Sequence, residues 1–231
     1  MSLAGQGAVC IWHDLAPEAS DEFYQWHDRE HMPERVSIPG FLRGRRYIVV
    51  AGAPTYFNLY EAESVEVLGG DAYLARLNAP TAWTRRVVPS FRRTARSICR
   101  VAFSAGVGDG GFMLTQRFDL APADGPRTIE ALCERLLPPL EAGRGIAGVH
   151  LCLADEARSR TDTAEKRERT DATAIPGWIV LIEGISESDV RAAGESLADD
   201  LRALLGAASP PIDTSIYQLQ HQVSKPQCPV R

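Results

Sequence analysis

Two kinds of apolar periodicity alternate along the chain and predict its order of strands and helices. Short apolar runs bounded by Pro or Gly are typical of strands, whereas apolar residues three or four positions apart are typical of amphipathic helices. The clearest helical spacing is that of Val190, Leu197 and Leu204. The pattern predicts eight strands, at residues 8–14, 41–50, 56–63, 95–104, 112–120, 146–154, 178–183 and 214–223.

Helices are predicted between the first and second strands, and between the third and fourth strands, of each group of four. Ser20 precedes two acidic residues, which is typical of a helix start, and Pro33 predicts a kink or restart of the first helix near His31. The order β-α-β-β-α-β therefore occurs twice. The predicted helices cover residues 20–36, 65–77, 128–142 and 189–205, and residues 78–89 are expected to be irregular or to hold a short helix.

The sequence also repeats itself at a fixed offset. Asp14–Pro17 (Asp-Leu-Ala-Pro) returns 105 residues later as Asp119–Pro122. Two copies of one supersecondary unit explain a repeat of this length better than a solenoid does. The same offset relates two further pairs, Pro33 with Pro138 and Gly40 with Gly145.

The repeat predicts an α+β protein made of two ferredoxin-like β-α-β-β-α-β units, at residues 1–105 and 111–231. Each unit has helices on one face of its sheet only, so the other face needs a cover. We therefore expect the two sheets to pack against each other as an intramolecular α+β barrel. In the second unit the offset rises from 105 to 122, which indicates a 17-residue insertion within residues 155–173. Its polar composition predicts a mobile surface loop.

Composition narrows the class of protein. The chain is 45% hydrophobic and 24% charged, so it can bury a core. A formal net charge of −5 argues against a nucleic-acid partner, and the arginine-rich stretch at residues 85–100 is interpreted as solvated surface. No apolar run approaches the ~20 residues that span a bilayer, and the start lacks the basic region of a secretory signal. With five scattered Cys interpreted as reduced thiols, a cytoplasmic protein without a membrane partner is expected.

Three segments, Glu22–Tyr47, Tyr56–Ser64 and Pro80–Arg86, resemble the dimeric α+β barrel superfamily, and within it the EthD-like proteins. The shared pattern is a helix that ends in His-x-Pro, followed by Pro-Gly and a strand; here it reads His31–Pro33 and Pro39-Gly40. The resemblance implies a pocket between helices and sheet, reached by His31. It also implies binding, or conversion without a cofactor, of a small apolar or aromatic molecule.

His31 is the expected catalytic acid/base, because an imidazole with an ordinary pKa takes up or releases a proton near neutral pH. His27, one turn earlier, would support it. The second unit has Leu132 and Leu136 at the matching positions, so this chemistry is expected once per chain. The expected ligand-binding residues are Trp26, Arg45, Tyr47, Asn58, Tyr60 and Trp83, among which Arg45 and Tyr47 share one strand face and Asn58 and Tyr60 share a face of the next strand.

Other functions fit the same residues. A non-catalytic ligand-binding or assembly module of this fold would use His31 as a cap bonded to a backbone carbonyl, whereas a pocket above ~300 Å³ beside His31 would favour a ligand. Residues His27–His31 also match the zinc pattern H-x-x-E-H, for which Glu61 or Glu63 could supply a third ligand, and a histidine can ligate haem. We expect no metal or cofactor. Either a monomer with an internal pseudo-dimer or a homodimer is compatible with the sequence.

Overall fold

Eight strands close into a single barrel. The computed structural model describes residues 3–225, without the side chain of residue 208, and the order around the barrel is β1-β3-β2-β8-β5-β7-β6-β4. Every neighbouring pair is antiparallel. The strands are β1 (Gly7–Leu15), β2 (Phe41–Ala51), β3 (Tyr56–Ala62), β4 (Phe91–Gly106), β5 (Phe112–Phe118), β6 (Ile146–Ala154), β7 (Trp178–Gly184) and β8 (Asp213–Ser224).

The barrel consists of two four-stranded sheets with the same internal order. The first half runs β4-β1-β3-β2 and the second half runs β8-β5-β7-β6, so the first and third strands of each unit lie in the middle. The sheets join edge to edge at two seams, β2 with β8 and β4 with β6. The predicted α+β fold, with two β-α-β-β-α-β units in an intramolecular barrel, is confirmed.

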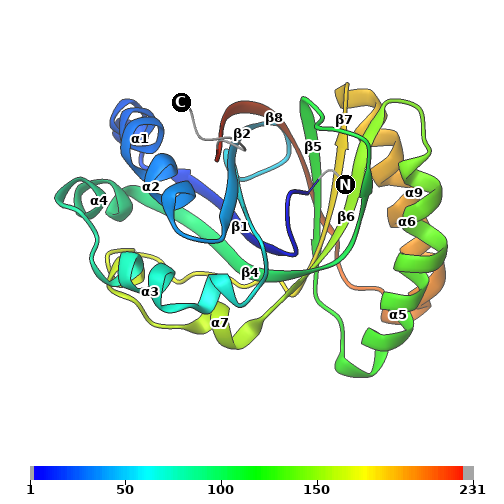
Figure 1. The fold of residues 1–231 in the computed structure, drawn as a ribbon. Coiled ribbons are helices and arrows are strands. Elements are labelled where there is room, and N and C mark those ends of the chain that lie inside the picture. Colours follow the sequence, from blue (N-terminus) through cyan, green and yellow to red (C-terminus); the bar gives the residue numbers. More distant parts are fainter. Residues whose placement is uncertain (1–2, 226–231) are drawn as a thin grey trace.

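Helices cover the outer face of each sheet (Figure 1). In both halves the first helix contains a π-helical turn, η2 (His27–His31) and η6 (Leu132–Leu136), and these turns lie 105 residues apart. The predicted switch near Pro33 is thus a π turn followed by a new α-helical segment. The first half has α1 (Ser20–Trp26), α2 (Met32–Ser37), α3 (Asp71–Asn78) and α4 (Ala82–Val87); the second has α5 (Gly125–Ala131), α6 (Leu137–Glu141) and α9 (Glu187–Leu205). Short 3-10 turns span Pro17–Ala19, Val67–Gly69, Val88–Ser90, Pro122–Asp124 and Gly206–Ala208.

Strand pairing shows which residues of the two halves are equivalent. In the first half, Arg45 of β2 pairs with Leu59 of β3. In the second half, His150 of β6, 105 residues after Arg45, pairs with Leu181 of β7, 122 residues after Leu59. The Pro-Gly stop of the first helix recurs as well, because Gly40 and Gly145 have φ of +82° and +73°. This left-handed backbone region favours glycine. The two sequence offsets therefore hold in three dimensions.

The barrel interior is packed with apolar side chains around one buried ion-pair network. Trp12, Tyr47 and Phe57 belong to this core and are fully buried. The guanidinium of Arg45 lies 2.8 Å from Glu183 and 3.1 Å from Glu61, which are equivalent glutamates of the two halves. Burial by itself would raise the pKa of the Glu183 carboxyl, but the charge of Arg45 and the bond to His150 lower it to about 2.

The insertion is folded and is not a bare loop. It forms α7 (Glu156–Arg160) and α8 (Ala164–Arg167), whose first turns are capped by Asp155 and Thr163. The insertion crosses to the first half, where the Ser159 hydroxyl accepts the amide of Ile98 at 2.9 Å, and α8 contacts α3. The composition of the segment is polar, but these specific bonds fix it on β4.

Two further findings concern membrane-spanning helices and the cysteines. Within residues 3–225, no helix combines the length and the apolar character that crossing a membrane requires. Cys10, Cys99, Cys133 and Cys152 are free thiols, and the first two and Cys152 are buried. Cys228 lies outside the described residues.

Replacing Arg45 with Met tests the interior network. The substitution leaves Glu61 and Glu183 buried without this cation, so we expect the free energy of unfolding to fall by about 3–5 kcal/mol. The matched control is Arg160→Met, which removes an exposed pair with Glu156 and should change stability by less than about 0.5 kcal/mol. Urea unfolding at pH 7 measures both. A loss for Arg45→Met as small as that of the control would contradict the prediction.

Candidate functional site

Polar side chains gather on the outer face of the first-half sheet, beneath α1, η2 and α2. His27 and Asn58 are 2% exposed, Tyr60 is 3% exposed and His31 is 7% exposed. Together with Trp26 they line a cavity of about 30 Å³. Since one water needs at least about 10–15 Å³, the cavity in this conformation has room for water and not for a metabolite.

A hydrogen-bond chain leads through His27 to the hydroxyl of Tyr60. The Arg46 guanidinium lies 3.2 Å from Nδ1 of His27, and Nε2 of His27 lies 3.2 Å from the Tyr60 hydroxyl. A guanidinium can only donate, so Nδ1 accepts and the proton of the neutral imidazole sits on Nε2. His27 then donates to the Tyr60 oxygen, and the hydroxyl proton of Tyr60 remains available to a group in the cavity.

A second chain orients Asn58. Nδ1 of His13 lies 3.1 Å from the backbone oxygen of Asp14, which can only accept, so Nε2 of His13 accepts from the Asn58 amide nitrogen at 3.0 Å. The amide oxygen of Asn58 is buried and has no hydrogen-bond partner among the described residues. The fixed orientation therefore leaves an acceptor without a partner at the cavity that Asn58 lines.

His31 lies against the Trp26 ring, with 4.2 Å between the ring centroids. Its Nδ1 atom is buried and bonds to nothing in residues 3–225, so His31 does not use this nitrogen as a helix cap. Buried polar atoms are normally hydrogen-bonded, and each exception needs an explanation. Nδ1 of His31 and the Asn58 oxygen are thus two buried polar atoms without partners among the described residues, on residues that line the same cavity as Tyr60.

All three histidines of this region are held neutral. Burial, followed by the charge of Arg35, lowers the pKa of His31 well below its ordinary 6.5. Burial and Arg46 do the same to the pKa of His27, and burial lowers the pKa of His13 to about 3. The expectation of an ordinary imidazole pKa at His31 is therefore corrected: in this conformation it is a neutral base and hydrogen-bonding group, and not a proton donor near neutral pH.

The second half has an apolar side chain at six of the equivalent positions. Strand registers and the shared π turn relate six polar residues of the first half to six apolar residues that pack together in the second. The fold can thus be built without polar groups at these six positions, although Gln116, the equivalent of Ile11, is a buried polar residue beside Val180 in the second half. The pairs are His13 with Phe118, His27 with Leu132, His31 with Leu136, Arg46 with Leu151, Asn58 with Val180 and Tyr60 with Ile182.

The insertion closes the cavity from the side of β4. Glu165 of α8 is paired with the buried Arg35 of α2, and both Glu165 and Arg169 line the cavity beside His31. The equivalent edge of the second half is an open groove of about 490 Å³. The short turn between β2 and β3 borders this groove with Gly52. The groove includes Thr214, the register equivalent of Arg96. The difference in free volume thus coincides with the 17-residue difference in loop length.

Three expected ligand-binding residues lie elsewhere. Arg45 and Tyr47 alternate with Arg46 along β2, so they point into the barrel interior, on the opposite side of the sheet from His31. Trp83 packs in an aromatic cluster with Phe23 and Trp26, and does not line the cavity. Trp26, Asn58 and Tyr60 do lie with His27 and His31. Sequence reasoning missed Arg35, Tyr73, Arg96, Glu165 and Arg169, which also line the cavity.

Only one of the missed residues carried a sequence signal. Ile11 pairs with Asn58 on one side and with Arg96 on the other, so alternation along the fourth strand would place Arg96 on the face of Asn58 once the strand order is known. Nothing in the sequence relates Glu165 and Arg169 to the first half. Their position follows from the path of the insertion.

The zinc and haem interpretations find little support in the site. Glu61 is bonded to Arg43 inside the barrel, so it cannot join His27 and His31 on a metal. No three His, Cys, Asp or Glu side chains within residues 3–225 are grouped so that they could hold a metal ion. Both nitrogens of His27 are engaged, and a haem does not fit a cavity of about 30 Å³.

Comparison with known proteins identifies the fold. No family model matches the sequence, and no curated protein is significantly similar to it. Solved structures with the same fold include an anthrone oxidase-like protein (13% identity, TM-score 0.64, 97% of this chain and 95% of that chain). Also similar is a "Putative monooxygenase" from Fusobacterium nucleatum, with 8% identity and a TM-score of 0.62 over 96% of both chains. A variant of the chlorite dismutase from Candidatus Nitrospira defluvii has 9% identity and a TM-score of 0.53, over 94% of this chain and 92% of that chain. At these identities the likeness concerns the ferredoxin-fold α+β barrel alone.

Replacing His31 with Leu, the residue at the equivalent position 136, tests its buried neutral state. Unfolded His31 binds a proton below about pH 6.5, whereas the folded protein does so only at lower pH, so His31 makes stability fall as the pH falls below 6.5. We expect the variant to lose less stability between pH 6.5 and 5, by up to about 1.4 kcal/mol per pH unit. Urea unfolding across this range measures the slope, and an unchanged slope would mean that folded His31 titrates normally.

Proposed function

We propose that the first half binds a small apolar or aromatic molecule beside His31 and converts it by proton transfer. The observation that carries this proposal is the contrast between the two halves. The first half has His27, His31, Asn58 and Tyr60 at positions where the second half has Leu, Val and Ile. Burying polar groups costs free energy that aliphatic side chains avoid. A selected chemical role explains why the first half keeps them.

The chemistry that fits these groups is removal of a proton from a carbon that is conjugated with a carbonyl oxygen. His31, held neutral, would take the proton at Nδ1. The negative charge that develops on the substrate oxygen would be met by the Tyr60 hydroxyl, which is a stronger donor because His27 donates to its oxygen. The resulting enolate of an electron-rich aromatic ketone can react with O₂, as in anthrone + O₂ → anthraquinone + H₂O.

Binding requires the insertion to move. The enclosed volume beside His31 is about 30 Å³, whereas ligand sites usually offer about 300–1,000 Å³. The equivalent groove of the second half, which has only a short turn beside it, offers about 490 Å³. Displacement of α8, with the Arg35–Glu165 pair opened, would therefore give the first half room for a ring system.

The finer assignment, a tandem EthD-like protein with an oxygenase-type reaction, belongs to the same proposal. The pattern His31–Pro33 with Pro39-Gly40 supports it. The anthrone oxidase-like structure and the monooxygenase structure share the fold, and their names are consistent with an oxygenase-type reaction. The alternative of another class is a non-catalytic binding or assembly module. The small enclosed volume favours the assembly role, which needs no ligand pocket.

Anthrone is the probe for both functions. We expect wild-type protein to bind anthrone, seen as a change in Trp fluorescence, and to accelerate its oxidation, seen as O₂ uptake and anthraquinone absorbance. Tyr60→Phe should lower kcat by about 10²–10³, as loss of an oxyanion donor does. His31→Leu should lower kcat by about 10²–10⁴, as loss of a general base does.

Arg202→Ala is the control, because Arg202 lines the open groove of the second half and is remote from His31. It should leave binding and turnover unchanged. Binding that depends on His31 without any turnover would favour the non-catalytic module. Binding that is lost only in Arg202→Ala would place the ligand in the other half and overturn the proposal, as would the absence of binding.

A further inference from the structure

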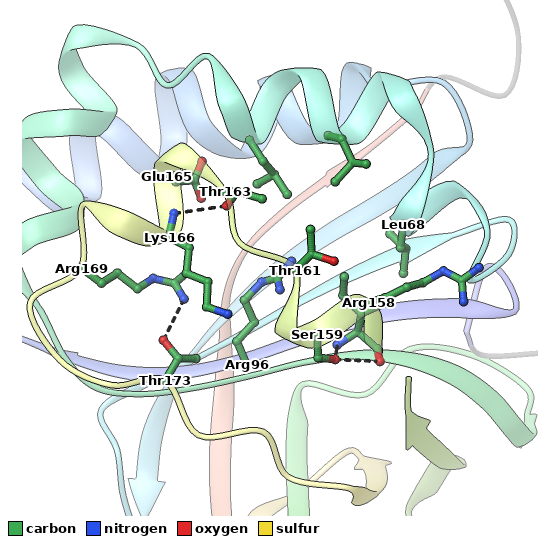
Figure 2. Close-up of a pocket in the computed structure, with 13 residues that line it drawn as sticks. Leu68, Arg96, Arg158, Ser159, Thr161, Thr163, Glu165, Lys166, Arg169 and Thr173 are labelled. Atoms are coloured by element: carbon green, nitrogen blue, oxygen red, sulfur yellow. Dashed lines mark hydrogen bonds between the residues drawn. The ribbon is translucent and has the colours of Figure 1, made fainter. Parts of the chain in front are cut away.

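A second cavity adjoins the one beside His31 and is rich in cationic side chains. It encloses about 20 Å³ between β4, α3 and the insertion, and it shares Arg96, Glu165 and Arg169 with the first cavity. Figure 2 shows Arg96, Lys166 and Arg169 extending into this space from two segments that are far apart in the sequence. The two cavities are therefore parts of one region that the insertion divides.

Two of these cations lack a carboxylate. Arg96 is buried and donates to the Tyr73 hydroxyl at 3.0 Å; Arg169 donates to the Thr173 hydroxyl at 3.2 Å, and its Nε atom is buried without a partner. No carboxylate within residues 3–225 lies within 4 Å of either guanidinium. Buried charges are normally paired, so two neighbouring guanidiniums bonded only to hydroxyls point to an anion that is bound at another stage.

The carboxylates nearby are already committed. Glu165 and Glu34 both pair with Arg35, and Asp155 pairs with Arg158. Lys166 also lines the second cavity, and its ammonium donates to the backbone oxygen of Arg160 at 3.2 Å. Three arginine cations, Arg35, Arg96 and Arg169, thus face two carboxylates, Glu34 and Glu165, which leaves one positive charge in excess where the two cavities meet.

We propose that Arg96 and Arg169 bind the carboxylate of an aromatic acid whose ring lies against His31 and Trp26. This inference rests on the proposed function and specifies its substrate class. The planar fork of each guanidinium matches a carboxylate, and Leu74 and Leu77 on the α3 side and Trp26 on the other would enclose the apolar part of the ligand.

The same arrangement links the ligand to the state of His31. The charge of Arg169 contributes to the low pKa of His31 and of His13, so it is felt across the cavity. A carboxylate bound to Arg169 would offset that charge and make His31 a stronger base when substrate is present. Because Arg169 belongs to the insertion, the same carboxylate would also hold the insertion in place over the ligand.

The experiment compares 2-naphthoate with its neutral isostere 2-naphthamide by calorimetric titration. We expect wild-type protein to bind the acid at least about tenfold more tightly, as a charge-assisted hydrogen bond allows. Arg169→Gln and Arg96→Gln should each remove this preference while the amide binds as before, and Arg169→Lys should keep part of it. His31→Leu should weaken both compounds. Arg167→Gln is the matched control, because Arg167 is exposed on α8 and paired with Asp162.

Other outcomes separate the two proposals, with unfolding midpoints showing that each variant is folded. Equal binding of acid and amide in wild type, both weakened by His31→Leu, overturns the carboxylate site and leaves the proposed function standing. Inorganic phosphate that binds through Arg169 and is not displaced by 2-naphthoate overturns the assignment in favour of a free-anion site. If neither naphthalene compound binds while anthrone does, the carboxylate site is wrong and the proposed function stands; if anthrone does not bind either, both proposals are wrong.

Discussion

The pairing of Arg45 with Glu61 and Glu183 is the interaction on which the barrel depends. The interior is filled with aromatic and aliphatic side chains, where an isolated charge would be strongly destabilising. The network satisfies its charges only when both sheets contribute, since Glu61 comes from β3 and Glu183 from β7. The backbone amide of Gly110, in the segment that joins the halves, also donates to Glu183 at 3.2 Å. Closure and the path of the connection are therefore fixed together.

Because the interior closes the barrel, the two outer sheet faces are free to differ. The second half fills its outer face with Leu132, Leu151 and Ile182, which need no partners. The first half carries His27 and Tyr60 at the places of Leu132 and Ile182 and must satisfy them through connected hydrogen bonds. Such a network is stable only where its members are paired. Nδ1 of His31 and the amide oxygen of Asn58 are the members of this layer that keep no partner among the described residues.

The topology also explains why a segment of the second half closes a site in the first. At the seam β6 lies beside β4, so the loop that follows β6 emerges over the first half; the turn that follows β2 emerges beside β8 in the same way. In a homodimer of identical units both loops would be equal. Fusion into one chain allows a long insertion at one seam and a short turn at the other, so the halves differ in access as well as in polarity.

The sequence by itself determined the order of elements, the repeat, the need of two one-sided sheets to cover each other's open faces, and the presence of His27 and His31 in one half only. These follow from local periodicity and from comparison of the chain with itself. Only the tertiary structure decided which strand face lies inside, because alternation defines two faces without saying which is buried; Arg45 thus became a structural ion pair and Arg46 a neighbour of His27. It alone placed Arg169 and His31 on the same cavity, because the proximity of residues 138 positions apart depends on how strands pair across a seam and leaves no local signal.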